Sequence, residues 1–541
     1  MEITCLGAAR CVTGSCYLIE NGSGKYLIDC GLFQGGRQME SLNRGPWGFN
    51  PSEISALFIT HAHIDHTGRI PKLVHDGFRG KIYTTAPTTE LVKILLLDSA
   101  HIQEMEAEWQ NRKNNRRGEP VVQPLYSLAD AEACFPLFEP VNRGEIISIN
   151  SHFSIRFRNS GHILGSSFLE VWEGPPENSP KTVFTGDLGH KNQMIVEDPD
   201  NIADAETLFI ESTYGNRNHK SFKESEQELL KAIQHSHSRG EKVIIPAFAV
   251  ERTQELLYVL GRFFREKLIP SMPVYVDSPL AIAATAIFRS MKQFYDSETR
   301  AVMEQGFDPF DFDQLVLTRS APESMAINET SGPAIVIAGN GMCTAGRIRH
   351  HLKHNLWRQG CSVVMVGFQA EGSLGRSLIE GARMVKILGE RVIVRAKILT
   401  IGGLSSHADQ SSLLEWLSHL KNPKMRVFVM HGEQSISEEF AGIIRRKFGF
   451  ETRVPAIGDR ITETGLEAAP VLRPGVEPGW RARLAELLRK AEEIRATLEN
   501  PAHPIPRHMV RHMEEELLSA ERHLEVALES MVRTDAASFK R

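Results

Sequence analysis

The chain has 541 residues, of which 41% are hydrophobic and 24% charged, and its formal net charge at pH 7 is −5. A chain of this length and composition builds several domain-sized units with substantial cores, which excludes a disordered or fibrous protein. The slightly acidic balance excludes a chain that is basic throughout, so a nucleic-acid partner would require a local basic groove.

The cysteines give no sign of an oxidising compartment. All seven are scattered, their number is odd, and no CxxC pair occurs, so neither a disulfide framework nor a cysteine-ligated zinc site is indicated. The first residues lack the basic and apolar regions of a signal peptide, and no apolar run reaches the roughly 18 residues of a membrane span. We therefore expect a cytoplasmic protein without a membrane partner.

The predicted elements of the N-terminal part are mostly strands. The runs EITCLGA, CYLIENG and KYLIDCG are short, apolar and broken by glycine, as strands and hairpins are. EISALFITHA predicts a buried strand that runs into a histidine-rich loop. The apolar spacing from Thr89 to about Arg117 predicts a long helix. Two later strands, KTVFTGD and ETLFIES, each end in a carboxylate.

A second α/β part follows, in which a strand, a loop and a helix occur in that order four times. The four strands lie in EKVIIPAF, PVYVDSP, PAIVIAGN and CSVVMVGF. This repeat predicts a parallel sheet with crossover helices. Glycines and small residues gather where each strand ends, at the edge where open α/β sheets bind ligands.

The C-terminal part begins with two more predicted strands, in AKILTIGG and MRVFVMHGE, and then changes character. Residues Trp480 to Asn500 and Arg507 to about Thr534 are rich in Ala, Glu, Leu and Arg at helical spacing, and PAHPIP separates them. This predicts a helical hairpin, for which self-association is favoured over a basic arm for RNA, because Glu and Arg are nearly balanced there. The apolar stripe that favours a homodimer consists of Leu484, Leu487, Leu488 and Ile494.

The most informative stretch is ITHAHIDHTGRIP, directly after the predicted buried strand. Imidazole and carboxylate are ligands that suit zinc, and His61 and His63, two residues apart in an extended loop, leave the same side. Asp65 and His66 follow at once. One zinc takes about four ligands and usually draws them from distant segments, so four ligands this close predict two metals. A loop that is merely polar would not require this order.

Further ligands are expected where other strands end. His162 lies in the turn NSGHILGSS, Asp187 in FTGDLG and His431 in VMHGE. A carboxylate can bridge two cations, which suits Asp187. We predict two zinc ions per chain, with manganese as an alternative. The predicted sets are His61, His63 and His162 for one metal, and Asp65, His66 and His431 for the other, with Asp187 between them.

The HxHxDH loop, followed by a single histidine and a single aspartate, resembles the metallo-β-lactamase superfamily. LIDCGLFQG supplies the early Asp29, whose implied role is to support the ligand loop. FIESTYGN, GLSSHADQ and VMHGE resemble motifs A, B and C of the β-CASP branch of nucleic-acid-processing hydrolases, with Glu211, His407 and His431 as the motif residues. The resemblance runs from Met1 to about Gly458.

The resemblance implies an α/β fold, in which a parallel α/β β-CASP domain is inserted into a metallo-β-lactamase αββα sandwich and a C-terminal helical hairpin follows. PAFAVERTQE, NGMCTAGRIRHHLK and GFQAEGSLGR are similar to the inserted domain of bacterial and archaeal RNA-specific exonucleases and of the cleavage and polyadenylation endonuclease subunit. The implied bounds are residues 1–212 and 395–460 for the sandwich, 213–394 for the insertion and 476–541 for the hairpin.

Histidine at motif C implies the branch that acts on RNA, because the branch that acts on DNA usually has valine there. The chain departs from the family pattern at Leu404, Ser406 and Glu251, where phenylalanine, alanine and glycine, respectively, are expected or common. None of these positions is a predicted ligand. The metal site itself is therefore untouched by the departures.

The implied reaction is hydrolysis of phosphodiester bonds in single-stranded RNA. Two zinc ions would lower the pKa of a water molecule and hold the phosphate, with Asp65 and Asp187 in the catalytic set. His407 is the candidate general acid for the leaving ribose oxygen, and Glu211 would orient it and favour the imidazolium. The candidate substrate-binding residues are Arg252, Arg347, Ser373 and Arg376.

Three alternatives stay open at this point. The enzyme could cut RNA from an end, internally, or in both ways. A hydrolase of a small-molecule ester or thioester would share the metal loop, but it has no need of motif B or of an inserted domain. A catalytically silent RNA-binding scaffold that needs a partner would be expected to lose ligands, and none is missing.

Overall fold

The structure, a computed structural model, describes residues 1–367, 369, 372–463 and 465–468. The helical hairpin predicted at residues 476–541 lies outside the described residues. Three large sheets and one two-stranded hairpin make up the strands of the described part. No helix in these ranges is long and apolar enough to cross a membrane.

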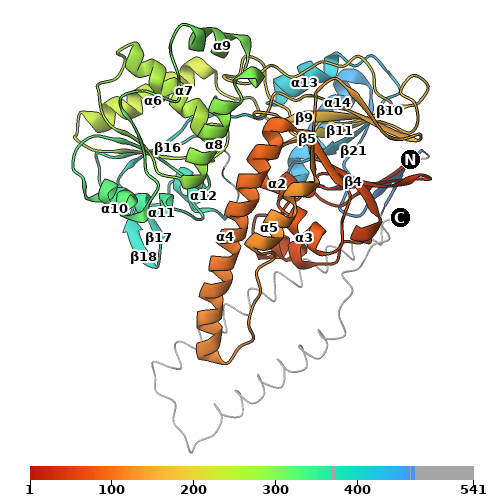
Figure 1. Cartoon of the computed structure of the whole chain (residues 1–541). Helices are drawn as coiled ribbons and strands as arrows, with labels where there is room; N and C mark the ends of the chain where they lie inside the picture. Colours follow the sequence, from red (N-terminus) through yellow and green to blue (C-terminus); the bar gives the residue numbers. More distant parts are fainter. Residues whose placement is uncertain (368, 370–371, 464, 469–541) are drawn as a thin grey trace, which may run out of the picture. The chain divides into compact units, whose positions relative to one another are not determined.

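Two of the sheets pack face to face (Figure 1). The first sheet has the strand order β23-β22-β1-β2-β3-β4-β5-β6, and the second has the order β21-β20-β11-β10-β9-β8-β7. The first consists of β1 (Glu2–Cys5), β2 (Tyr17–Asn21), β3 (Gly24–Ile28), β4 (Ile54–Phe58), β5 (Lys81–Thr85), β6 (Phe138–Val141), β22 (Arg460–Thr462) and β23 (Gly465–Glu467). The second consists of β7 (Ile146–Asn150), β8 (Phe153–Asn159), β9 (Ser167–Trp172), β10 (Lys181–Phe184), β11 (Thr207–Glu211), β20 (Arg426–Met430) and β21 (Glu451–Arg453).

Aromatic side chains fill the contact between these two sheets. Phe184 on β10 and Phe209 on β11 stack with their ring centroids 4.6 Å apart, and Phe209 stacks on Phe428 of β20 at 5.1 Å. Tyr17 of β2, from the opposite sheet, meets the edge of Phe184 at 5.0 Å. Because side chains alternate between the two faces of a strand, these rings fix which face of each strand is buried.

Helices cover the outer faces of both sheets, as the core clusters show. Apolar residues of α3 (Ile70–His75), α4 (Ala86–Arg117) and α5 (Leu128–Ala133) pack on the first sheet. Those of α13 (Gln410–Ser418) and α14 (Gln434–Phe448) pack on the second. The result is the αββα sandwich that the sequence implied.

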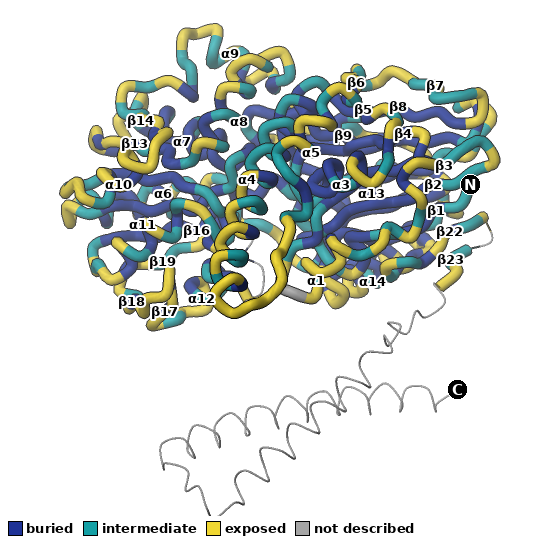
Figure 2. Tube along the Cα trace, turned by 60° about the horizontal axis from the view of Figure 1, so that its bottom comes forward, coloured by how far each residue is buried: buried dark blue, intermediate teal, exposed yellow. Residues whose placement is uncertain are grey.

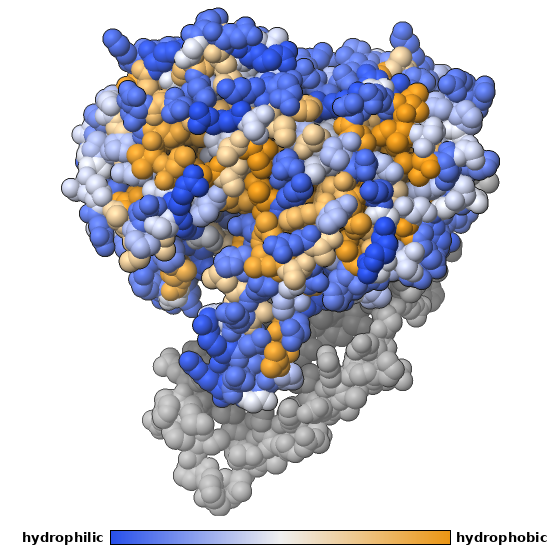
Figure 3. All heavy atoms as spheres, viewed as in Figure 1, coloured by the Kyte–Doolittle hydropathy of each residue, from blue (hydrophilic) through white to orange (hydrophobic). Residues whose placement is uncertain are grey.

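The long helix α4 confirms the helix predicted up to Arg117. It begins after Thr85, whose hydroxyl accepts from the Thr88 N–H, and it ends at Gly118, a glycine with φ of 67°. Its C-terminal half carries exposed apolar residues, including Met105 and Trp109, amid hydrophilic ones (Figure 3). Its N-terminal half is buried against the sandwich and against α8 (Pro279–Ser290).

The third sheet is parallel throughout and has the order β14-β13-β15-β12-β16-β19. Its strands are β12 (Val243–Pro246), β13 (Val274–Val276), β14 (Leu315–Leu317), β15 (Ile335–Ala338), β16 (Ser362–Met365) and β19 (Lys397–Thr400). Apolar residues of α6 (Phe222–His237), α7 (Arg252–Arg265) and α8 cover one face. Those of α10 (Ala321–Glu329), α11 (Ile348–Asn355) and α12 (Leu374–Ile379) cover the other. The four predicted strand–loop–helix units are confirmed as β12–α7, β13–α8, β15–α11 and β16–α12.

The strand pairing bears on the C-terminal border of the inserted part, which the sequence analysis places after residue 394. β19 pairs in parallel with β16 of the third sheet, with Val364 opposite Leu399. The next strand, β20, belongs to the second sheet. Residues 397–400, which the sequence analysis assigned to the sandwich, pair instead with the edge of β16. We therefore propose that the insertion extends to Thr400, and the other domain borders stay predictions.

Removing the central ring between the sandwich sheets tests this packing. Phe209→Ala should lower the free energy of unfolding by about 3–5 kcal/mol, because the lost ring leaves a cavity between two closely packed sheets. The shift in the urea unfolding midpoint measures the change. The matched control, Met325→Ala on α10, removes a side chain that is 63% exposed, and it should change stability by less than about 0.5 kcal/mol. Equal effects of the two substitutions would contradict the packing role of Phe209.

Candidate metal centre

The predicted ligands come from loops that follow strands of both sandwich sheets. Parallel strands place their carboxyl ends at a common edge, and β4 of the first sheet and β10, β11 and β20 of the second end beside one another there. The loop after β4 carries His61 and His63, and the short helix α2 (Ile64–Thr67) that follows it carries Asp65 and His66. His162 lies in the loop between β8 and β9, Asp187 follows β10, and His431 follows β20. All seven side chains are brought together there.

Two glycines allow these loops to approach closely. A Cβ atom on Gly31 would lie 1.5 Å from the carbonyl oxygen of Asp65, so only glycine lets the loop after β3 pass the histidine-rich loop. A Cβ atom on Gly189 would lie 1.8 Å from the carbonyl oxygen of Gly161. That second contact brings the Asp187 loop against the His162 loop.

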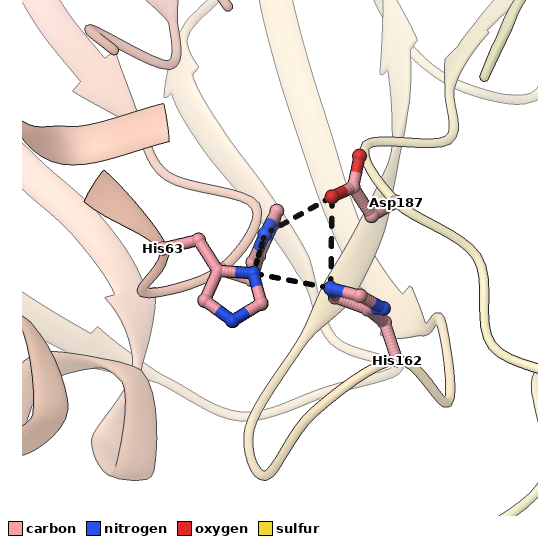
Figure 4. A group of neighbouring side chains, drawn as sticks. His63, His162 and Asp187 are labelled. Carbon is pink, nitrogen blue, oxygen red and sulfur yellow. Dashed lines mark hydrogen bonds and ion pairs between the residues drawn. The ribbon is translucent and has the colours of Figure 1, made fainter. Parts of the chain in front are cut away.

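The first group of donors consists of His61, His63, His162 and Asp187. The Nδ1 atom of His63 lies 3.1 Å from Nε2 of His61 and 3.2 Å from Nε2 of His162. The Oδ2 atom of Asp187 lies 3.4 Å from Nε2 of His61 and 3.6 Å from Nε2 of His162. Figure 4 shows the His63 ring facing His162, and His162 facing the Asp187 carboxylate. Four donors around one zinc at about 2.0–2.1 Å would lie about 3.3–3.4 Å from one another, which matches these separations.

The second group consists of Asp65, His66 and His431. The Nε2 atoms of His66 and His431 lie 3.1 Å apart, and Nε2 of His431 lies 3.6 Å from Oδ2 of Asp65. The other oxygen of Asp187, Oδ1, is 3.5 Å from Nε2 of His66 and 3.4 Å from Nδ1 of His431. Asp187 thus presents one oxygen to each group.

The charges of this cluster fit metal cations. Within the described residues, the carboxylates of Asp29, Asp65, Asp187 and Glu211 form ion pairs with histidines alone and with no lysine or arginine. The Asp187 Oδ1 atom is buried and, in the described part of the chain, has no hydrogen-bond donor. Burying an anion without a compensating cation is costly. The donor set therefore fits a metal site, where divalent cations would balance the charge of the buried carboxylates.

Three of the imidazoles are held in the form that a metal requires. Burial lowers the pKa of His63 to about 4, and burial likewise keeps the pKa values of His61 and His162 well below the ordinary value. A histidine ligand must be neutral at the nitrogen that binds. These three rings are thus deprotonated at neutral pH and ready to bind.

Asp29 supports the loop, in the place that the resemblance implied. Its Oδ2 atom accepts a hydrogen bond of 2.7 Å from Nδ1 of His66, which leaves Nε2 of His66 free for the second group. Its Oδ1 atom accepts from the Thr60 N–H at 2.9 Å, and Ser15 donates to Oδ2. Asp29 adopts a φ of 57°, a left-handed conformation that is rare for a residue other than glycine.

His407 and Glu211 lie beside the first group. The Nδ1 atom of His407 is 3.3 Å from Oε1 of Glu211 and 3.9 Å from Oδ2 of Asp187. The same Glu211 oxygen accepts from the Leu188 N–H at 2.6 Å, which fixes the carboxylate. Although burial opposes the charge of the ring, Glu211 and Asp187 raise the pKa of His407 to about 9. About a fifth of the His407 side chain is exposed, so it borders the open side of the cluster.

Three histidines hold the backbone of the loop that carries His407. His190 donates from Nε2 to the Ser405 carbonyl at 3.0 Å, His162 donates from Nδ1 to the Ser406 carbonyl at 3.1 Å, and His219 donates from Nε2 to the His407 carbonyl at 3.1 Å. The sequence analysis did not single out His190 or His219. Their partners lie 215 and 188 residues away in the chain, and no local pattern marks such contacts.

Glu251 links the inserted part to the same cluster. Its Oε2 atom accepts from the Leu164 N–H at 2.9 Å, two residues after His162, and its side chain is buried. Glu251 has a φ of 65°, which explains why glycine is common here, but glycine could not make this hydrogen bond. The only signal in the sequence was its departure from the family pattern.

The four predicted substrate-binding residues are not part of this cluster. Arg252 is buried and paired with Glu255, and Arg347 donates to Asp277 at 2.7 Å. Ser373 caps α12 by accepting from the Arg376 N–H, and the Arg376 side chain pairs with a glutamate on the same helix. Their substrate-binding roles stay predictions.

Comparison with known families agrees with this fold and this centre. The model of the metallo-β-lactamase superfamily matches residues 9–85, and the model of the Beta-Casp domain matches residues 253–378. A third model, described as a Zn-dependent metallo-hydrolase RNA specificity domain, matches residues 391–455. The fold and the centre are thus those of a metallo-β-lactamase-type hydrolase.

Curated relatives show to which branch of the metallo-β-lactamase superfamily the chain belongs. Ribonuclease TTHA0252 of Thermus thermophilus is 37% identical over 434 residues, which cover 80% of this chain and 94% of the relative. The transcription termination factor FttA of Methanocaldococcus jannaschii is 30% identical over 85% of this chain and 71% of its own. FttA of Lokiarchaeum is 32% identical over 84% and 70%. The chain belongs to the β-CASP branch of the metallo-β-lactamase superfamily.

The support given by Asp29 can be tested through metal binding. Asp29→Ala should weaken zinc binding at the second group by about 10–100-fold, because His66 loses the acceptor that orients its ring. A zinc titration against a competing chelator measures the two affinities.

Ser15→Ala is the matched control. It removes another hydrogen bond to the same Asp29 oxygen but leaves the contact between Asp29 and His66 in place. Zinc affinities that fall equally in both variants would mean that general loosening of the loop, and not the orientation of His66, is responsible.

Proposed function

We propose that the chain is a zinc-dependent ribonuclease that hydrolyses phosphodiester bonds of single-stranded RNA. The proposal rests on the position of His407. Its Nδ1 atom lies 3.9 Å from Oδ2 of Asp187 and 3.3 Å from Oε1 of Glu211, which orients the ring. A leaving ribose oxygen needs a proton, and a general acid placed beside the metal ligands supplies it. A small-molecule hydrolase that shares the metal loop has no need of this pair.

The comparisons support RNA as the substrate. A relative of which this chain covers 94% is named a ribonuclease. The family model described as an RNA specificity domain spans residues 391–455, which include both His407 and His431. Relatives named transcription termination factors also match over 84–85% of the chain.

Two zinc ions would be held by the two donor groups, with Asp187 shared between them. Zinc, when bound there, would polarise the phosphate and lower the pKa of a water molecule that attacks phosphorus. The side chains of Asp65 and His407 are each 20% exposed, so the centre opens to substrate on their side. Of the remaining ligands, His63 is partly exposed, and the others are buried and exclude bulk water.

His407 handles the proton of the leaving group. Its Nδ1–H faces Glu211, so Nε2 is the atom that would give its proton to the departing ribose oxygen. Glu211 favours the protonated ring and fixes its direction. The hydrogen bonds from His162, His190 and His219 to backbone carbonyls fix the position of the loop that carries His407.

Self-association through residues 476–541 stays a prediction from the apolar stripe of that segment.

The proposed activity is tested with 5′-labelled single-stranded RNA, matched DNA and an ester substrate. The zinc-loaded protein should cleave RNA in preference to the other two substrates. His407→Ala should reduce the cleavage rate by about 10²–10⁴-fold with the zinc content unchanged, as expected for a general acid. The product ladder then distinguishes cleavage at an end from internal cleavage.

Ser406→Ala is the control for the His407 variant. It changes the neighbouring side chain but keeps the backbone carbonyl that His162 contacts, so its cleavage rate should stay near that of the parent. Full activity of His407→Ala would refute the general-acid role. Ester cleavage without RNA cleavage would refute the ribonuclease proposal.

The partnership of His407 with Glu211 predicts a change in the pH profile. A general acid works while protonated, so activity is lost as the pH rises through its pKa. Glu211→Gln removes the charge that raises the pKa of His407. The alkaline limb of kcat/KM against pH should therefore move to lower pH in this variant. An alkaline limb that stays in place would show that His407 is not the titrating acid.

A further inference from the structure

A small hairpin of the inserted part presents a basic surface. It consists of β17 (Met384–Ile387) and β18 (Glu390–Ile393), and it lies beside α11 and α12 (Figures 1 and 2). Val385, Ile387 and Val392 point inward and join the core cluster that contains Leu352 and Leu356. The opposite face of the hairpin is exposed.

Like charges face each other across this exposed face. Lys386 lies directly opposite Arg391 in the strand register, and Arg383 and Arg395 flank the pair along the chain. Within the described part of the chain, none of these four side chains forms an ion pair. The hairpin's own acid, Glu390, is already paired with Lys353. Like charges in register destabilise a hairpin, and an anion from another molecule would relieve this repulsion.

The local charge stands out from the rest of the chain. Residues 381–397 contain five lysines or arginines and one acid, whereas the whole chain has a formal net charge of −5. A basic stretch inside an acidic protein is the electrostatic footprint expected for a polyanion.

An exposed tryptophan lies next to these cations. Trp357 is 50% exposed and follows α11. The preceding residue, Leu356, accepts hydrogen bonds of 2.8 Å from the backbone N–H groups of both Arg395 and Ala396, so the ring lies beside the base of the hairpin. The Arg358 guanidinium lies 5.5 Å from the ring centroid, and the exposed part of the indole offers a flat surface on which a nucleobase can stack.

We propose that this surface, formed by Trp357, Arg383, Lys386, Arg391 and Arg395 and called the hairpin patch, binds single-stranded RNA outside the metal centre. The four cations would contact successive phosphates, and Trp357 would stack on a base. Cations combined with an exposed aromatic ring favour single-stranded nucleic acid over an acidic protein, which would need no stacking surface. This inference rests on the proposed function, because the RNA it holds is the substrate of the centre.

A second anchoring point makes binding depend on the length of the RNA. A strand long enough to reach both the metal centre and the hairpin patch gains affinity from the second contact, because that contact is then intramolecular. A strand that fills only the metal centre gains nothing. The patch should therefore affect long RNA and leave short RNA unchanged.

The experiment compares Lys386→Ala/Arg391→Ala with the parent chain, using the zinc-loaded full-length protein. Binding of a labelled single-stranded RNA of about 30 nucleotides is measured in a His407→Ala background, where cleavage is suppressed. The double variant should bind about tenfold more weakly, and the slope of log K against log salt should fall by about 1.4, since each lost phosphate contact contributes about 0.7. Trp357→Ala should weaken binding by about tenfold with an unchanged salt slope.

Two controls separate the patch from general effects. Lys267→Ala/Lys292→Ala removes two exposed cations elsewhere in the inserted part, and it should change neither affinity nor salt slope. Cleavage of an RNA of about six nucleotides, measured with His407 intact, should be the same in the patch variant and the parent.

Unchanged affinity and salt slope in the patch variant would overturn the inference. Polyglutamate that binds as tightly as RNA, with the same loss in the patch variant, would also overturn it and would make an acidic protein the partner. Failure of the proposed function gives a different result, since the parent chain would then leave even the short RNA uncut. Patch-dependent binding of the long RNA would in that case still support the patch as an RNA-binding surface.

Discussion

The carboxylate of Asp187 is buried without a lysine or arginine partner among the described residues. It is buried at the edge where the two sandwich sheets meet, and its described ionic partners are all histidines. Each of its oxygens faces a different group of donors. We propose that two divalent cations balance this carboxylate and that the two donor groups would hold them.

The loops around Asp187 are held in place by contacts between segments that lie far apart in the chain. Asp29 and His431 adopt left-handed conformations, which cost free energy and persist where the surrounding structure fixes them. The His407 loop directly follows β19 of the inserted sheet, so the position of that sheet constrains where the loop can lie. Glu251 adds a direct hydrogen bond from the inserted part to the His162 loop. The insertion is thus tied to the metal centre.

Those elements and site residues that follow a short local pattern could be predicted from the sequence. The HxHxDH loop, the carboxylates at strand ends, the helix α4 and the four parallel units all follow short patterns. The assignment of β19 to the third sheet did not, because a short apolar strand fits either sheet until its pairing partner is known. The contacts of His190, His219 and Glu251 join segments far apart in the chain, and no periodicity encodes them.

The central claim is a two-metal centre built around Asp187, and its most direct test is the zinc content of a sample that cleaves RNA. Native mass spectrometry of the parent chain and of Asp187→Asn, with the cleavage rate measured on the same preparations, gives both quantities. The account predicts two zinc ions per parent chain, and loss of both bound zinc and cleavage in the variant. One zinc per chain in a fully active sample, or an active Asp187→Asn variant, would contradict it.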